Sequence, residues 1–241
     1  MGLFLSLGVA AQNLVPNPDF EQLIDPEERK EKDFRAYGMV KDFSMDWGAA
    51  TESLPDLYLD IDESCKKPGK VTAPCNDYGY QETKNGVLYA GFRAYSKSPK
   101  LKRSYLQVQL TEKLQENQKY CVSFDLSLAD LSRYAVPDIG AILSDRKIER
   151  GGTAPIVQKP DVQHKSNKTM VYMDGWETVC GTFTGTGRGL KKFNPDIELV
   201  ALQPETALHG LEGWKHLETA RVPKIYDNTI QDRTMLISTT E

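Results

Sequence analysis

Apolar and polar residues alternate along much of this chain, and a period of two predicts β-strands with one buried face. The longest example is 119–128, where every even-numbered residue from Tyr120 to Leu128 is apolar. A polar run at 111–118 separates it from a similar stretch at 105–110, which predicts two antiparallel strands joined by a surface loop. Two shorter strand candidates are 139–143 and 176–183.

Helical signals are weak by comparison. Residues 25–32 begin with Asp and Pro, as a helix start prefers, but they carry no apolar stripe, so we expect a loop or a short exposed turn. Polar, proline-bearing connections follow at 130–138 and 151–169. Many strands, few helices and long loops predict an all-β fold, an antiparallel β-sandwich.

The N-terminus is almost wholly apolar, and small residues precede Gln12, which predicts a signal peptide at 1–11. Its usual basic start is missing, so a truncated leader is one explanation. The alternative is a buried N-terminal strand of a cytosolic protein. The next segment, 13–21, predicts that the mature chain opens with an extended strand.

Size and charge narrow the class of protein. The chain has 241 residues, of which 39% are hydrophobic and 27% charged, enough for one large sandwich or two small domains. The net charge of -4 argues against nucleic acid as a partner, because phosphates require a basic face. After the leader there is no run of eighteen apolar residues, so we predict no membrane span.

Four cysteines form an even set, which an oxidising compartment allows to pair. Cys65 and Cys75 flank a short, turn-rich stretch, and we expect a disulfide there, stabilising the fold by about 2–3 kcal/mol. Cys121 and Cys180 each lie opposite the apolar face of their strand. For this second pair two alternatives stay open: a cross-strand disulfide, or two thiols buried on the second face.

Several phrases occur in an order that resembles a family of exported Bacteroidetes jelly-roll domains: 13–21, 76–81, 85–91, 118–129 and 175–183. Such domains are galactose-binding-like or carbohydrate-binding-module-like sandwiches, and they often precede an OmpA-like domain. The resemblance covers roughly 12–187. It implies an antiparallel jelly-roll β-sandwich there, exported to the periplasm, the outer membrane or the cell surface.

Beyond Gly187 the resemblance ends, and 188–241 forms a divergent C-terminal segment. Tyr226 to Asn228 resembles the remnant of the family's closing strand, which we expect near 224–232. A divergent insertion, a partner-docking segment and a sequencing artefact are open explanations for the remainder.

The resemblance also implies a structural calcium ion, which in such sandwiches ties the first strand to the last through a carboxylate from each. Glu21 and Asp227 are the matching positions in this sequence. The alternative is that both are ordinary surface carboxylates.

Glycan recognition requires flat aromatic rings for sugar faces and polar groups for hydroxyls. Trp47 and Trp176 are expected in the core, as large aromatic residues of sandwiches usually are. Each remaining candidate has a core or turn role as its alternative. These candidates are Tyr78, Tyr80, Gln81, Arg93, Tyr95 and Tyr134.

No nucleophile or zinc-protease motif occurs, and the acids Asp56, Asp60, Asp62 and Glu63 are expected to be solvated loop residues. The sequence therefore predicts a non-catalytic envelope or cell-surface module that binds a glycan or an envelope protein. One alternative is a structural subunit of a gliding or secretion assembly, docking through the C-terminal segment. The other is a polysaccharide-acting enzyme that uses Asp60 or Asp62.

Overall fold

The computed structural model describes residues 13–29, 39–61, 64–95, 103–132, 139–144, 146–152, 154–156, 158–163, 175–185, 198–199 and 235–238. Several predicted features lie outside these ranges: the signal peptide at 1–11, Tyr134, the closing strand at 224–232 and Asp227. Within the described part, no helix is long and apolar enough to cross a bilayer.

The larger sheet has six strands in the order β12-β8-β14-β6-β2-β3. Neighbours are antiparallel except β2 and β3. The strands are β2 (Asp56–Asp60), β3 (Thr72–Ala73), β6 (Leu88–Phe92), β8 (Lys119–Leu128), β12 (Glu177–Thr184) and β14 (Met235–Ser238).

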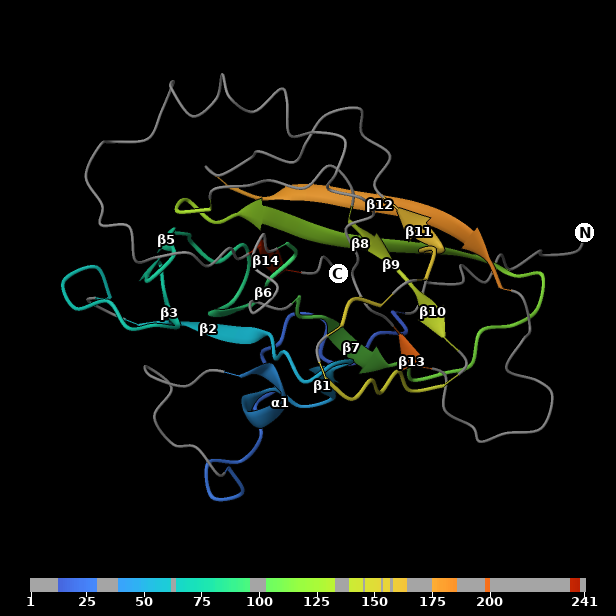
Figure 1. The fold of residues 1–241 in the computed structure, drawn as a ribbon, viewed down its shortest axis with the longest axis horizontal. Helices are drawn as coiled ribbons and strands as arrows, with labels where there is room; N and C mark the ends of the chain where they lie inside the picture. The colour runs from blue at the N-terminus through green and yellow to red at the C-terminus, as the bar shows by residue number, and fades with distance from the viewer. Residues whose placement is uncertain are drawn as a thin grey trace, which may run out of the picture.

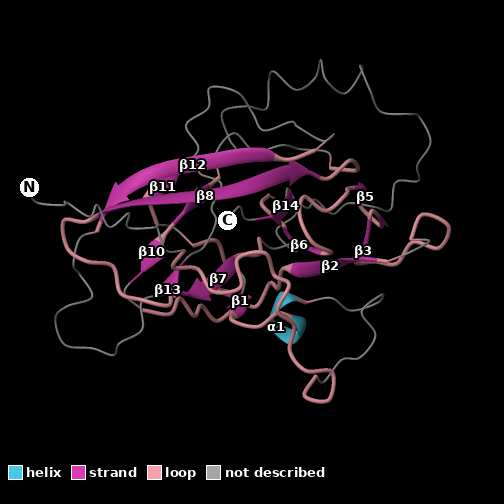
Figure 2. Cartoon of the chain, turned by 180° about the vertical axis from the view of Figure 1, so that it is seen from behind, coloured by secondary structure: helices cyan, strands magenta, loops and turns pink. Residues whose placement is uncertain are grey.

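The second sheet has four antiparallel strands in the order β1-β7-β13-β10. They are β1 (Trp47–Ala49), β7 (Leu106–Gln109), β10 (Leu143–Ser144) and β13 (Glu198–Leu199). Short pairs join β4 (Cys75–Asn76) to β5 (Gly79–Tyr80) and β9 (Gly140–Ala141) to β11 (Val162–Gln163). Helix α1 (Val40–Phe43) is a single turn beside the smaller sheet (Figure 2).

The two sheets lie face to face, with β8 and β12 in one layer and β1 and β7 in the other (Figure 1). From β6 onward the main strands alternate between layers: β6, β8, β12 and β14 belong to the larger sheet, and β7, β10 and β13 to the smaller. This alternation is the connectivity of a jelly roll. The predicted all-β sandwich is therefore confirmed.

One apolar core fills the space between the sheets. Its buried side chains come from both layers, among them Leu57, Leu88, Phe92, Phe124 and Leu126 from the larger sheet and Leu106 and Val108 from the smaller. Strand β8 spans the predicted range 119–128, and its even-numbered residues from Phe124 to Leu128 belong to the main core as expected. Asp125 and Ser127 on the opposite face are buried as well, so that face is not the polar, solvated one that we expected.

The pairing predicted for 105–110 and 119–128 is wrong. These segments become β7 and β8, which belong to opposite sheets, and the intervening loop crosses from one layer to the other. A local pattern shows which face of a strand is buried but not which partner it takes, because an antiparallel neighbour and a facing strand bury the same residues. The strand candidate at 176–183 becomes β12, which pairs with β8 along its whole length.

The opening segment is not the extended strand that we expected. Asn17 and Phe20 have positive φ angles of 46° and 67°, and the chain turns back on itself. The Asn17 side-chain amide connects this turn to a distant segment of the chain: Nδ2 donates to Ser44 Oγ at 3.0 Å and to the Met45 carbonyl at 2.9 Å. Prolines on both sides of Asn17 lack the N–H that a ladder needs, so side-chain hydrogen bonds replace strand pairing.

Candidate functional site

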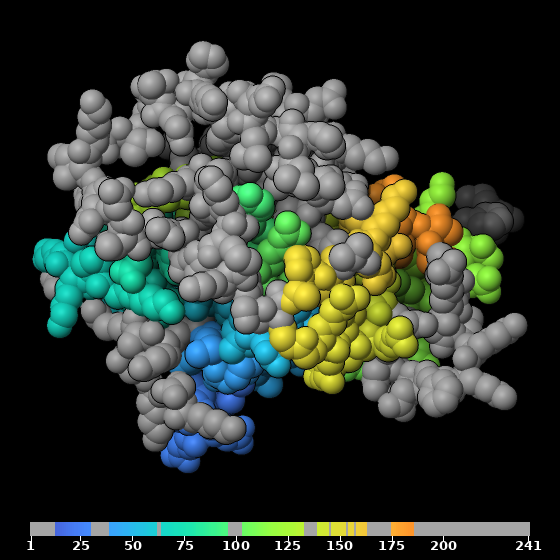
Figure 3. All heavy atoms as spheres, viewed as in Figure 1, coloured from blue at the N-terminus to red at the C-terminus, as the bar shows by residue number. Residues whose placement is uncertain are grey.

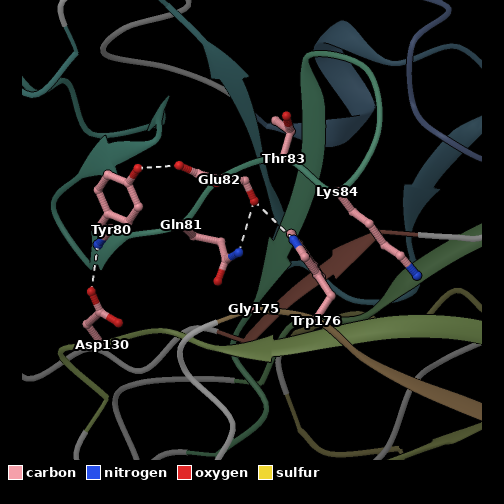
Figure 4. Close-up of a pocket in the computed structure, with 8 residues that line it drawn as sticks. All are labelled: Tyr80, Gln81, Glu82, Thr83, Lys84, Asp130, Gly175 and Trp176. Atoms are coloured by element: carbon pink, nitrogen blue, oxygen red, sulfur yellow. Dashed lines mark hydrogen bonds between the residues drawn. The ribbon is translucent and has the colours of Figure 1, made fainter.

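A pocket of about 440 Å³ opens at the outer side of the larger sheet (Figure 4). Its walls are residues 80–84, Asp130 and residues 175–176. In the space-filling view, the teal segment that leads into residues 80–84 forms the left edge of the molecule, away from the yellow segment right of the centre (Figure 3). The pocket thus belongs to the end of the sandwich that carries β3 to β5.

Tyr80 supplies an open aromatic surface to this pocket, since 49% of the residue is exposed. The Asp130 carboxylate accepts the Tyr80 backbone N–H at 2.8 Å, and the Tyr80 hydroxyl donates to Glu82 Oε1 at 2.5 Å. Gly79 permits the approach of Asp130, because a Cβ built there, at a φ of +124°, would lie 2.5 Å from the Asp130 Cβ. Both ends of the Tyr80 residue are therefore held while its ring stays open to solvent.

The main-chain carbonyl of Glu82 holds two other residues of the pocket lining, Gln81 and Trp176, in place. It accepts hydrogen bonds from Gln81 Nε2 at 2.9 Å and from Trp176 Nε1 at 3.0 Å (Figure 4). Ser127 Oγ donates to Gln81 Oε1 at 2.5 Å, so both ends of the buried Gln81 amide are engaged within the protein. Gln81 shapes the pocket, and the orientation of the Trp176 ring is set before any ligand arrives.

Aromatic rings support the pocket from below. The Trp176 ring meets Tyr89 edge-on at 5.6 Å between centroids, and Tyr89 stacks on Tyr58 at 4.9 Å. Tyr78 packs against Tyr58 and is only 7% exposed. These rings form a second apolar cluster on the side of the larger sheet that faces away from the main core.

Lys84, which lines the pocket, forms an ion pair with the buried Asp125 beneath it. Lys84 Nζ is 2.7 Å from Asp125 Oδ1, and Thr178 Oγ1 donates to the same oxygen at 2.5 Å. The Asp125 side chain is fully buried, whereas that of Lys84 is 28% exposed. The other Asp125 oxygen, Oδ2, is buried and has no hydrogen-bond partner in the described part of the chain. The charge of Lys84 is thus compensated from beneath.

Carboxylates raise the pKa of two phenols, Tyr80 in the pocket and Tyr89 beneath it. The hydrogen bond to Glu82 raises the pKa of Tyr80, and burial and the charges of Glu82 and Asp60 raise it further. Burial raises the pKa of Tyr89, and the charges of Asp60 and Asp130 add to that rise, while a hydrogen bond from Asn76 opposes it. Nearby carboxylates therefore act on both phenols in the same direction.

Of the five predicted ligand residues that the structure describes, two lie together at the pocket. Tyr80 and Gln81 line the pocket. Tyr78 is buried in the aromatic cluster and offers no face to a ligand, because the sheet needs its ring for packing. Arg93 and Tyr95 follow β6 and lie outside the pocket lining, Tyr95 packing against the main core. Tyr134 lies outside the described residues.

Sequence reasoning missed the rest of the pocket. Residues 82–84 continue the polar run after Gln81, and that run was the available signal. Trp176 was assigned to the core, but it is half-buried and forms a wall, and its position between Gly175 and the start of β12 is typical of a loop junction. Asp130 is separated from Tyr80 by fifty positions, so only the fold reveals their contact.

Of the two residues predicted to bind calcium, Glu21 lies in the described part of the chain. Glu21 Oε1 accepts the backbone N–H groups of Val87 at 2.7 Å and Leu88 at 2.9 Å, so it already ties the opening segment to β6. The described residues contain no group of three side chains from His, Cys, Asp and Glu that could hold a metal ion. Because Asp227 lies outside the described ranges, the calcium site stays a prediction.

The cysteines divide into one pair and two free thiols. Cys65 and Cys75 form a disulfide, as predicted. Cys121 and Cys180 are free and exposed, so neither alternative for them was right. The register pairs Cys121 with Thr182 and Cys180 with Ser123, which makes the two cysteines diagonal neighbours. Diagonal Cα atoms lie roughly 7–8 Å apart, beyond the usual reach of a disulfide.

The expected loop of acids is in part a strand. Asp56 and Asp60 are the two ends of β2, while Asp62 and Glu63 lie outside the described residues. Asp60 is exposed and does not line the pocket. These acids therefore contribute no catalytic pair to the site that the structure describes.

No protein-family model matches the chain. A stretch of 59 residues, 24% of this chain, is 48% identical to cysteine synthase of Aquifex aeolicus, and the match spans 18% of that enzyme's length.

Two solved structures are similar in outline. The CBM22-1 xylan-binding domain of Paenibacillus barcinonensis Xyn10C has a TM-score of 0.38 and 12% identity, with 86% of both chains covered. A CBM4 structure has a TM-score of 0.35 and 10% identity, with 93% of this chain and 95% of the other covered. Both scores are below 0.5, so the architecture given above rests on the strands of this chain.

Proposed function

We propose that this chain is a non-catalytic binding module that holds a glycan in the pocket between residues 80–84 and 175–176. The observation that carries the proposal is that Tyr80 and Trp176 line the same pocket. Tyr80 is about half exposed, and the Trp176 ring is fixed by its hydrogen bond to the Glu82 carbonyl. Flat rings pack against the apolar faces of sugars, and the volume of about 440 Å³ falls in the usual range for small ligands, roughly 300–1,000 Å³.

Polar groups for sugar hydroxyls surround these rings. The Glu82 carboxylate has an oxygen besides the one that accepts the Tyr80 hydroxyl, and Thr83 Oγ1, which donates to the Gly86 carbonyl at 3.0 Å, keeps acceptor capacity. The walls are held by hydrogen bonds within the protein. A ligand therefore meets a preformed site, which lowers the entropy cost of binding.

The cysteine synthase match does not change this proposal, because the shared stretch is 18% of that enzyme. The Cys65–Cys75 disulfide favours an oxidising compartment and hence export. The envelope setting remains part of the proposal. The alternative, a structural subunit that docks through 188–241, concerns residues that are almost all outside the described part.

A glycan array followed by titration calorimetry tests the proposal. Y80A should weaken binding by about tenfold, because it removes the exposed ring. M45A is the matched control, since Met45 is 45% exposed and lies outside the pocket lining, and it should bind like the unaltered protein. Retention of no glycan, or equal losses in both variants, would overturn the proposal. If the protein released new reducing ends from a glycan, the proposal that the module is non-catalytic would be overturned.

A further inference from the structure

The charges around the pocket carry a second inference, which rests on the proposed function. Two carboxylates, Glu82 and Asp130, and one ammonium, Lys84, belong to the described lining. Both carboxylates lie on the Tyr80 side, where one accepts its hydroxyl and the other its backbone N–H (Figure 4). Two carboxylates of the described lining therefore stand beside the open ring.

The lysine does not offset this charge for a ligand. Its Nζ is 2.7 Å from Asp125 Oδ1, and Asp125 is fully buried beneath the pocket, where it stays next to Lys84. A ligand carboxylate that approached Lys84 would compete with this internal partner and would also meet Glu82 and Asp130. Carboxylate charges also raise the pKa values of the nearby phenols: those of Glu82 and Asp60 act on Tyr80, and those of Asp60 and Asp130 act on Tyr89.

We propose that the pocket selects glycans without acidic groups and rejects uronic-acid and sulfated forms of the same backbone. Rejection arises from like-charge repulsion by the carboxylates of the lining, Glu82 above all, while Lys84, the cation in the described part of the lining, is already paired with Asp125. Repulsion of this kind is a specificity device that leaves the contacts of the accepted ligand unchanged.

The test compares neutral and acidic forms of the same glycan on one array. One pair is cellohexaose and its C6-carboxylated form, and another is fully methyl-esterified hexagalacturonate and free hexagalacturonate. Any other neutral glycan that the protein retains is compared with a carboxylated form of the same backbone. At about 10 mM salt, the neutral form should bind at least tenfold more tightly. Near 1 M salt, where the screening length falls to about 3 Å, the ratio should shrink towards one.

The double variant E82Q/D130N should lower the neutral-to-acid ratio at least fivefold, because both rim charges are gone while both side chains can still accept hydrogen bonds. The matched control E112Q/E116Q removes two exposed carboxylates from the loop between β7 and β8, with the same change in net charge. It should leave the ratio unchanged, which separates a local effect from the overall charge.

The outcomes separate the two proposals. Equal binding of neutral and acidic forms by the unaltered protein, or a ratio that E82Q/D130N does not change, would overturn charge selection and leave glycan binding intact. A control variant that changes the ratio as much as E82Q/D130N would also overturn it. Retention of no glycan at all would overturn the proposed function and this inference with it.

Discussion

The Lys84–Asp125 pair makes an asymmetric prediction about stability. Lys84 is partly exposed, so its ammonium can turn to water when its partner is lost, whereas Asp125 is fully buried and cannot. K84M leaves a buried carboxylate with only the Thr178 hydroxyl as a partner in the described structure. Breaking a buried pair in this way costs about 3–5 kcal/mol.

The converse change should be milder. D125N keeps the side-chain shape and an oxygen that can accept from Thr178, and its cost should be about 1–2 kcal/mol, that of one imperfectly paired buried amide. The double variant K84M/D125N should be about as stable as D125N alone. The second substitution would then rescue the first.

Urea unfolding of the four proteins, followed by tryptophan fluorescence, measures these free energies directly. In thermal scans K84M should lower the Tm by roughly 6–20 °C, since 1 kcal/mol corresponds to about 2–4 °C at this size. A K84M cost below about 1 kcal/mol would show that the pair is worth no more than a surface ion pair. A double variant less stable than K84M would contradict the argument from burial.

Three further predictions follow from the cysteines and from the Gly79 turn. Replacing Cys65 and Cys75 by serine should lower the free energy of unfolding by about 2.7 kcal/mol, the loop entropy of a ten-residue separation, and an unchanged urea midpoint would contradict this. Alkylation of the unfolded, unreduced protein should label the other two cysteines only, and mass spectrometry showing four labels or none would refute the assignment. G79A should unfold at a lower temperature than the unaltered protein, because its Cβ would overlap Asp130 at a backbone angle that L-residues rarely adopt; an unchanged Tm would refute the close approach.

Local periodicity was sufficient for several strands. The even-numbered apolar residues of β8 identified its core face, and the limits of β8 were predicted residue by residue. The face opposite was misjudged, because Asp125 and Ser127 are as buried as their apolar neighbours. Polar residues on alternate positions indicate a solvated face unless another segment covers it, and here residues 80–84 and Trp176 contact that face.

The pocket was predictable only in part. Tyr80 and Gln81 were found because aromatic and amide side chains stood together in a turn-rich stretch. Tyr78, two positions earlier, has the same chemistry but is buried. Residues two apart in a regular strand share a face, but Tyr78 precedes β5 and Gly79 between the two rings has a φ of +124°, so the strand rule does not apply to this pair. Composition alone does not distinguish the two rings.

The sequence by itself determined the class of fold, the longest strands and the disulfide between Cys65 and Cys75, because each depends on residues close together in the chain. Only the tertiary structure decided which strands share a sheet and which side chains form the pocket. Asp130 reaches Tyr80 across fifty positions, and Trp176 reaches Glu82 across ninety-four. Such contacts depend on how the two layers and their loops close, and no local pattern records that geometry.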